Sequence, residues 1–147
     1  PKSEHGAGAN ERSIAVKFRR HVALLLFLAA CAGTAPRVLD VTELAPPQQV
    51  RFERTGEGVV IRWKPSPHHD RAAFAGYNVY VSQRSLIFAE IAKLPEPVRV
   101  GKDSTQVLLR DLSKSATYFV HVRSRTREGD LSLPSLPELV IRPPAAD

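Results

Sequence analysis

The chain has 147 residues, which is enough for one ordinary domain and some additional sequence. It carries 21 Lys and Arg against 15 Asp and Glu, and this formal net charge of +6 invites a nucleic-acid or anionic-surface partner. A hydrophobic fraction of 43% excludes a chain disordered by composition, and a single cysteine excludes an internal disulfide framework and any zinc site with two or more cysteines.

The first 30 residues follow the plan of an export signal. A basic segment, 17–21, precedes an uninterrupted apolar run, 22–30, and small residues follow around Cys31. Counted as Val22–Ala32, the apolar run has 11 residues. A helix needs about 20 to cross the hydrocarbon core of a bilayer, so the run disfavours a permanent transmembrane anchor. A buried core helix of this length is the alternative.

The end of the apolar run, Leu28-Ala29-Ala30-Cys31, resembles the lipobox of bacterial lipoproteins. The resemblance implies that a diacylglycerol is attached to the Cys31 thiol, that the chain is cleaved before Cys31, and that two or more acyl chains anchor it stably. Ala32 stands where Asp retains such proteins at the inner membrane, which implies transfer to the outer membrane of a two-membrane cell. Ordinary secretion is the alternative, because Ala30-Cys31-Ala32 also fits a small-residue cleavage site.

These features divide the chain into four parts. Residues 1–30 are the upstream residues and signal peptide, 31–45 the lipidated cysteine and a tether, 46–144 one domain, and 145–147 a tail. Proline pairs mark both borders of the domain, because proline cannot continue a sheet ladder. Half of the net charge belongs to residues 1–30, and the remainder contains no basic run. Nucleic acid is therefore disfavoured as a partner.

Within the domain, apolar and polar residues alternate with a period of two, which predicts half-buried strands. The alternating runs, separated by turn signals, are 50–53, 59–64, 77–82, 118–123 and 139–142. Several short strands with this spacing predict an antiparallel sandwich or barrel. The apolar spacing of segment 86–94 also suits a helix, so the pattern alone does not decide its structure.

The stretch from Pro46 to Pro143 resembles a fibronectin type III domain. The ordered matches are Pro46-Pro47, Val59-x-Ile61-x-Trp63 with Pro65, Gly76 to Tyr80, Leu112 with Thr117-Tyr118, and Gly129, Ser132 and Pro134-Ser135. The resemblance implies an all-β, immunoglobulin-like sandwich of two antiparallel sheets. It also favours a strand within residues 86–94.

The resemblance implies a structural signature formed by Trp63, Tyr77, Leu112 and Tyr118. Trp63 takes the place of the buried tryptophan, whose truncation typically costs about 3–5 kcal/mol. Tyr118 takes the place of the tyrosine corner, in which the hydroxyl bonds to backbone a few residues upstream, near Leu112.

Two groups of residues are candidates for chemistry or binding. His68, His69 and Asp70 combine metal-ligand types, but neighbouring residues on an extended strand point in opposite directions, which favours a polar loop. The outward face of the two central strands carries Tyr80, His121, Arg123 and Arg125, and aromatic and arginine side chains are enriched at binding hot spots. A solvated sheet face is the alternative for this second group.

The sequence thus predicts a non-enzymatic protein of the bacterial cell envelope, with no metal and no cofactor. The expected partners are the membrane, through lipid on Cys31, and an envelope protein or a polysaccharide. The alternatives are an enzyme or enzyme inhibitor that uses the end loops, with His68, His69 and Asp70 as the first candidates, or a purely structural spacer.

Overall fold

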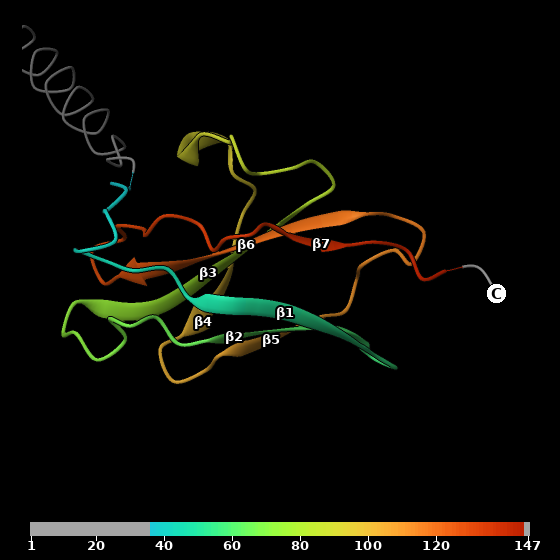
Figure 1. Ribbon diagram of the computed structural model, residues 1–147, viewed down its shortest axis with the longest axis horizontal. Coiled ribbons are helices and arrows are strands. Elements are labelled where there is room, and N and C mark those ends of the chain that lie inside the picture. Colours follow the sequence, from blue (N-terminus) through green and yellow to red (C-terminus); the bar gives the residue numbers. More distant parts are fainter. Residues whose placement is uncertain (1–35, 146–147) are drawn as a thin grey trace, which may run out of the picture. The chain divides into compact units, whose positions relative to one another are not determined.

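The structure is a computed structural model that describes residues 36–145, and these residues form two antiparallel sheets (Figure 1). One sheet has the order β1-β2-β5, with β1 at Gln48–Thr55, β2 at Gly58–Lys64 and β5 at Gln106–Leu109. The other has the order β4-β3-β6-β7, with β4 at Val98–Gly101, β3 at Phe74–Ser82, β6 at Tyr118–Thr126 and β7 at Leu139–Ile141. The predicted all-β, immunoglobulin-like sandwich is confirmed.

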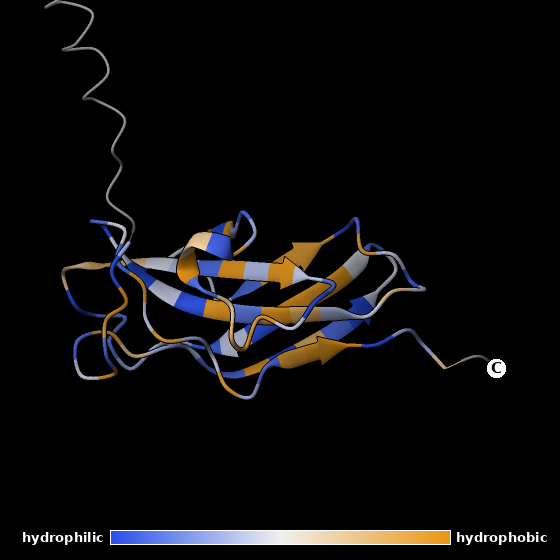
Figure 2. Ribbon diagram, turned by 90° about the horizontal axis from the view of Figure 1, so that it is seen from above, coloured by the Kyte–Doolittle hydropathy of each residue, from blue (hydrophilic) through white to orange (hydrophobic). Residues whose placement is uncertain are grey.

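The core lies between the sheets because alternate residues of each strand point inward, a pattern visible as bands of hydropathy in Figure 2. In β2, Val59, Ile61 and Trp63 are buried, whereas the residues between them are partly exposed. The Trp63 and Phe74 rings each pack edge-on against Tyr77, with ring centroids 5.2 Å apart in both pairs. Edge-on packing of aromatic rings adds to the stabilisation that burial alone provides.

The signature tyrosines each use their hydroxyl. The Ser113 backbone N–H donates to Tyr118 Oη at 3.0 Å, one residue from the expected position at Leu112, which itself packs against the core. The Ser66 backbone N–H donates to Tyr77 Oη at 3.1 Å, and burial raises the pKa of the Tyr77 phenol. Both bonds join a core ring to a connecting loop, so the core also fixes the loops at its borders.

The five alternating runs coincide with observed strands, the last running one residue past the end of β7, but two strands were not predicted. These are β4 and β5, which have only four residues each and too short an alternation to stand out. The strand expected within 86–94 is wrong: this segment contains a turn and the 3₁₀-helix η2, Ile91–Lys93, and the neighbouring strand begins only at Val98. Pro95 and Pro97 follow the helix, and prolines cannot donate to a ladder.

The packed unit begins earlier than the predicted border at Pro46. Leu39 and Leu44, which were assigned to the tether, are buried in the core. The Ala45 carbonyl accepts hydrogen bonds from Ser66 Oγ at 2.6 Å and Ser124 Oγ at 2.8 Å. Residues 36–45 therefore belong to the sandwich, because Leu39 and Leu44 are buried in its core and the Ala45 carbonyl is bonded there.

Two predicted features fall outside the described residues: the signal peptide within 1–30 and Cys31 with the first part of the tether. In the described part of the chain, no helix has the length and apolarity to cross a membrane.

Gly76 faces Gly101 across the β3–β4 pair, and the two glycines differ in their surroundings. Gly76 has φ +131°, and a Cβ there would collide with the Val100 carbonyl oxygen. A Cβ on Gly101 would meet nothing within 4 Å, and its φ is ordinary. Of these two facing residues, Gly76 is therefore the one that has to be glycine.

We predict that Gly76→Ala lowers the free energy of unfolding by at least about 2 kcal/mol, because it combines a backbone collision with a disfavoured φ. Gly101→Ala, the matched control, should change it by less than about 0.5 kcal/mol. Urea denaturation of both variants checks this, and equal midpoints for the two would contradict the expected close approach.

Candidate functional site

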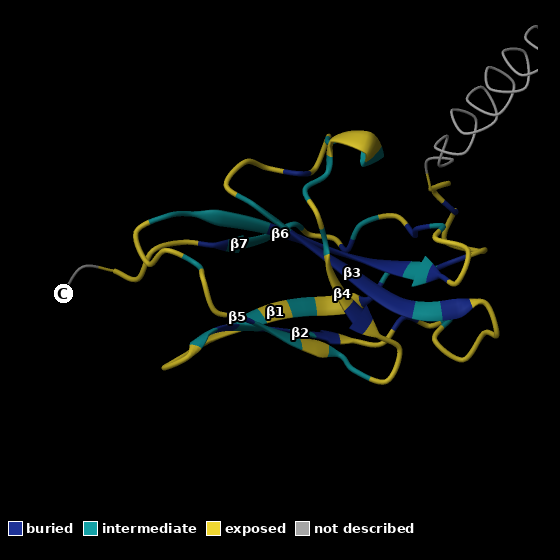
Figure 3. Cartoon of the chain, turned by 180° about the vertical axis from the view of Figure 1, so that it is seen from behind, coloured by how far each residue is buried: buried dark blue, intermediate teal, exposed yellow. Residues whose placement is uncertain are grey.

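The predicted binding face on β3 and β6 is covered, not solvated. Tyr80 and Arg123 are only 4% and 5% exposed, and His121 has no exposed surface, while Arg125 is half-buried. Figure 3 shows β3 and β6 as largely buried strands with an exposed loop above them. The expectation that these side chains face solvent is wrong for Tyr80, His121 and Arg123, because other segments of the chain cover them.

The main cover is the connection between β3 and β4, residues 83–97. Leu86 is buried against Tyr80 and Leu131 and forms with them a small second core, on the opposite side of the sheet from the main one. Ala89, Ile91 and Leu94 pack against this cluster. We call residues 83–94 the covering loop. It lies over the sheet because its apolar side chains find apolar partners there.

Glu138 holds the base of the covering loop. Its Oε1 accepts the Leu86 backbone N–H at 2.7 Å, and its Oε2 accepts the Ser85 hydroxyl at 2.7 Å. Its Oε1 also lies 3.1 Å from His121 Nε2. The Glu138 side chain is only 10% exposed and Leu86 is buried, so the hydrogen bond from the Leu86 N–H is partly shielded from water, which strengthens it, whereas Ser85 is exposed.

The remaining polar groups beneath the covering loop are partly satisfied. Asn78 Nδ2 donates to Tyr80 Oη at 3.1 Å, and Arg123 donates to the Ser132 carbonyl at 2.8 Å. Within residues 36–145, the buried Asn78 Oδ1, both ring nitrogens of His121 and Arg123 Nε have no hydrogen-bond partner, so the contact of His121 with Glu138 is one of proximity only. Buried polar atoms without a partner raise the free energy of the folded state.

Burial lowers the pKa of His121, and this effect outweighs the attraction of Glu138; the charge of Arg123 lowers the pKa further. Burial likewise lowers the pKa of the Arg123 guanidinium, and Tyr80 opposes that change. His121 is therefore held in its neutral form beneath the loop at neutral pH.

The tip of the covering loop presents two large apolar side chains. Phe88 is 94% exposed and Ile87 is 48% exposed. They stand directly after Leu86, so the same short segment is anchored at one residue and exposed at the next two. Aromatic side chains are enriched among the residues that contribute most of the binding energy at protein interfaces, so Phe88 is the candidate contact of this loop.

The histidine pair lies in the loop between β2 and β3 and takes part in its structure. The Ala45 backbone N–H donates to His68 Nδ1 at 3.0 Å, and His69 Nδ1 lies 3.0 Å from the Ser66 carbonyl. His69 Nε2 also lies 3.0 Å from Asp70 Oδ1. Within residues 36–145, no cluster of three or more His, Cys, Asp or Glu side chains is arranged to hold a metal ion.

Sequence reasoning missed the covering loop as a feature of its own. The pattern of residues 86–94 fits a helix or a strand, and neither predicts an exposed Phe88. Neither predicts the hydrogen bond from the Leu86 N–H to Glu138, which lies about 50 residues later in the chain. The signal available in the sequence was the cluster of apolar residues at 86–88 ahead of the proline-rich 95–97, a loop with more apolar content than a solvated loop needs.

Comparison with known proteins identifies the fold. Residues 45–139 match the family described as the fibronectin type III domain. Among solved structures, the third fibronectin III domain of the human KIAA0343 protein is similar, at 20% identity and a TM-score of 0.52, covering 79% of this chain and 90% of that one. A Fn3-like protein from Clostridium thermocellum is similar at 17% identity and a TM-score of 0.50, covering 71% and 97%. No curated protein matches.

We predict that stability falls as the pH is lowered from 8 to 5.5, and that His121 contributes to the slope. The unfolded chain takes up a proton on His121 near pH 6.5, whereas the folded chain does so only at lower pH. The unfolded state therefore binds more protons, and the free energy of unfolding rises with pH in this window.

His121→Gln should flatten this dependence, because it removes the ring whose pKa burial lowers. Denaturant unfolding at several pH values measures the slopes. A His121→Gln slope equal to that of the unmodified chain would show that burial does not lower the pKa of this ring.

Proposed function

The chain belongs to the fibronectin type III family, and we propose that its sandwich binds or scaffolds another component of the bacterial cell envelope. We propose further that the protein is anchored to the membrane by lipid. The partner is an envelope protein or a polysaccharide, and the sandwich performs no catalysis itself. An enzyme, an enzyme inhibitor and a structural spacer are the alternatives.

The observation that carries the binding role is the covering loop. Its base is fixed by Leu86 in the second core and by the hydrogen bonds to Glu138. Its tip places Phe88 in solvent. A fixed base reduces the conformational entropy lost on binding, and the ring supplies the apolar area that a contact needs. A spacer would gain nothing from an exposed phenylalanine.

The anchor rests on the sequence of the leader. The basic segment 17–21, the apolar run 22–30 and the small residues before Cys31 occur in the order that export and lipidation require. With lipid on Cys31, only a few residues separate the membrane from Pro36, where the packed unit begins. The sandwich would then stay close to the membrane surface, and Ala32 favours the outer membrane.

The enzyme alternative relied on His68, His69 and Asp70. His68 Nδ1 and His69 Nδ1 already contact backbone groups of their own loop and of the adjoining N-terminal segment. These contacts favour a structural role for both rings.

We predict that the exported protein incorporates labelled palmitate when it is expressed in a bacterial host, and that Cys31→Ser abolishes this, because the thiol is the atom acylated. Scintillation counting of the immunoprecipitated protein measures the label. If the unmodified protein carries no label, or if Cys31→Ser is processed in the same way as the unmodified protein, the proposed lipid anchor is wrong. The binding role would remain open.

We predict that Phe88→Ala weakens capture of the envelope partner by at least about tenfold, because hot-spot aromatics typically contribute about 2 kcal/mol or more. Stability should change by less than about 0.5 kcal/mol, since the ring is exposed. The full chain, immobilised and incubated with solubilised envelope proteins and with peptidoglycan, provides the measurement.

Val41→Ala is the matched control, because Val41 is also an exposed apolar residue but lies outside the covering loop. It should capture as well as the unmodified chain. Equal capture by Phe88→Ala and Val41→Ala would remove the covering loop as the contact. Absence of any captured component would favour the spacer.

A further inference from the structure

A cavity of about 280 Å³ opens at the end of the sandwich where β1 turns into β2. The segment after β5 and the chain after β7 complete its wall. It is lined by Arg54, Thr55, Gly56, Glu57, Gly58, Val59, Arg110, Leu112, Lys114 and Pro144. None of these residues belongs to the covering loop, so the cavity is a separate feature of the surface. Its volume lies at the small end of the range for ligand sites.

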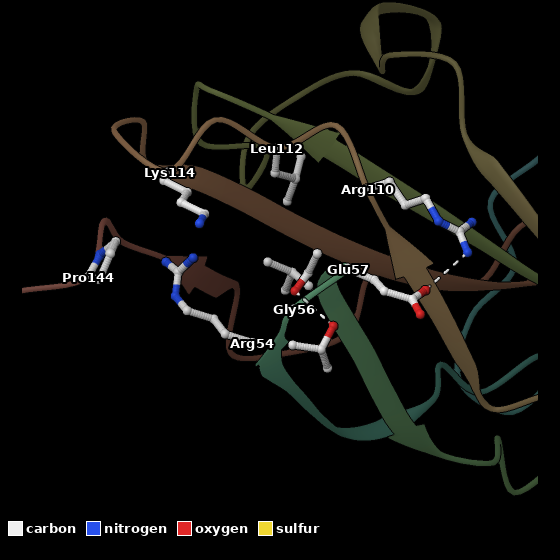
Figure 4. Close-up of a pocket in the computed structure, with 10 residues that line it drawn as sticks. Arg54, Gly56, Glu57, Arg110, Leu112, Lys114 and Pro144 are labelled. Atoms are coloured by element: carbon white, nitrogen blue, oxygen red, sulfur yellow. Dashed lines mark hydrogen bonds and ion pairs between the residues drawn. The ribbon is translucent and has the colours of Figure 1, made fainter.

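The charge of the cavity is mainly positive. Three of its lining side chains are cationic and one is anionic, and that one, Glu57, lies 3.4 Å from Arg110. Arg54 and Lys114 form no ion pair within residues 36–145. Figure 4 shows both of them pointing into the same space between Pro144 and Leu112, on the side away from Glu57. Two cations that face one space without an anion repel each other, and an anion between them relieves that repulsion.

The exposed Arg54 guanidinium has two contacts within the sandwich. One of its nitrogens donates to the Arg142 backbone carbonyl. Its charged carbon lies 5.9 Å from the centre of the Phe52 ring, within the range of a cation–π contact. A guanidinium with these contacts retains further N–H donors in a planar fork, the geometry that matches a carboxylate or a phosphate.

The rest of the wall combines apolar side chains with Thr55, whose hydroxyl donates to the Gly58 carbonyl at 3.2 Å. Val59 is buried in the main core, and Leu112 packs against it from the wall of the cavity. Pro144 closes the side opposite β2 with a ring that has no donor. A ligand that consisted of an anion alone would leave this surface in contact with water. A ligand with an apolar body beside its anionic group would cover it.

We propose that this cavity is a binding site for a small organic anion, in which Arg54 and Lys114 hold a carboxylate or phosphate group and Val59, Leu112 and Pro144 contact the attached apolar body. The site is independent of the covering loop and of the lipid anchor, so it stands whether or not the proposed function holds.

The test uses four probes with the full ¹⁵N-labelled chain in non-ionic detergent at a fixed pH of 7.5. Benzoate carries both features of the proposed ligand, benzyl alcohol lacks the charge, acetate lacks the ring, and phenyl phosphate replaces the carboxylate. The backbone amides of Gly56 and Gly58, which line the cavity, report binding by their chemical shifts, and the amide of Gly101 serves as a distant reference. We expect benzoate or phenyl phosphate to bind at least about tenfold more tightly than benzyl alcohol and than acetate.

Lys114→Ala should weaken binding of whichever aromatic anion binds more tightly by about fivefold or more. The double variant Arg54→Ala with Lys114→Ala should weaken that binding by at least about tenfold. Arg51→Ala with Lys102→Ala removes the same charge from exposed positions outside the cavity and should leave binding within about twofold. Lys114 makes no side-chain hydrogen bond or ion pair within residues 36–145, so its variant tests the site without threatening the fold.

Three results would overturn the proposal. The first is benzyl alcohol binding as tightly as both aromatic anions, which would make the cavity merely apolar. The second is an equal loss in the cavity double variant and in the Arg51 and Lys102 control, which would make the attraction a property of net charge. The third is the absence of shifts at Gly56 and Gly58 with all four probes.

Discussion

The Glu138 carboxylate joins the covering loop to the sheet, and the arrangement above β3 and β6 depends on it. Both of its oxygens are used by Ser85 and Leu86, and one also lies beside His121. Removing it would leave a buried N–H without an acceptor and would take from His121 the nearby negative charge that opposes its desolvation. The loop itself has little regular structure beyond η2, so its position is set by this carboxylate and by the burial of Leu86.

The sequence was sufficient for the parts of the fold that depend on local alternation. The runs around Trp63, Tyr77 and Tyr118 alternate over long strands, and the structure buries their inward faces. The four-residue strands β4 and β5 escaped because so short an alternation does not differ from chance. Leu39 and Leu44 escaped because their burial depends on contacts with distant residues, such as the bond from the Leu39 N–H to the Leu131 carbonyl.

The candidate site was predicted less well, for a physical reason. A period of two predicts that one face of a strand points away from the main core, but it does not reveal whether another segment covers that face. Tyr80, His121 and Arg123 were placed on the correct face and given the wrong environment. Leu86 of the covering loop packs with Tyr80, and the segment 131–138 supplies the polar neighbours of His121 and Arg123. The covering loop in turn exposes Phe88 to solvent. Two of these polar groups form buried hydrogen bonds: the Tyr80 hydroxyl accepts from Asn78, and Arg123 donates to the Ser132 carbonyl.

Hydrogen exchange at the Leu86 amide tests most directly whether Glu138 holds the covering loop in place. It is measured in the full unmodified chain, in Glu138→Ala and in Ser85→Ala. A loop held by Glu138 should have a protected Leu86 amide, with exchange at least about tenfold faster in Glu138→Ala. Ser85→Ala should change it little, because that variant removes the hydroxyl's bonds to Glu138 and to the Ile87 N–H but leaves the acceptor of the Leu86 N–H in place. The Val122 amide of β6, which donates to Ser135 Oγ, should stay protected in all three chains. A Leu86 amide that exchanges at the rate of an unstructured chain in the unmodified protein would contradict a loop held in place to present Phe88.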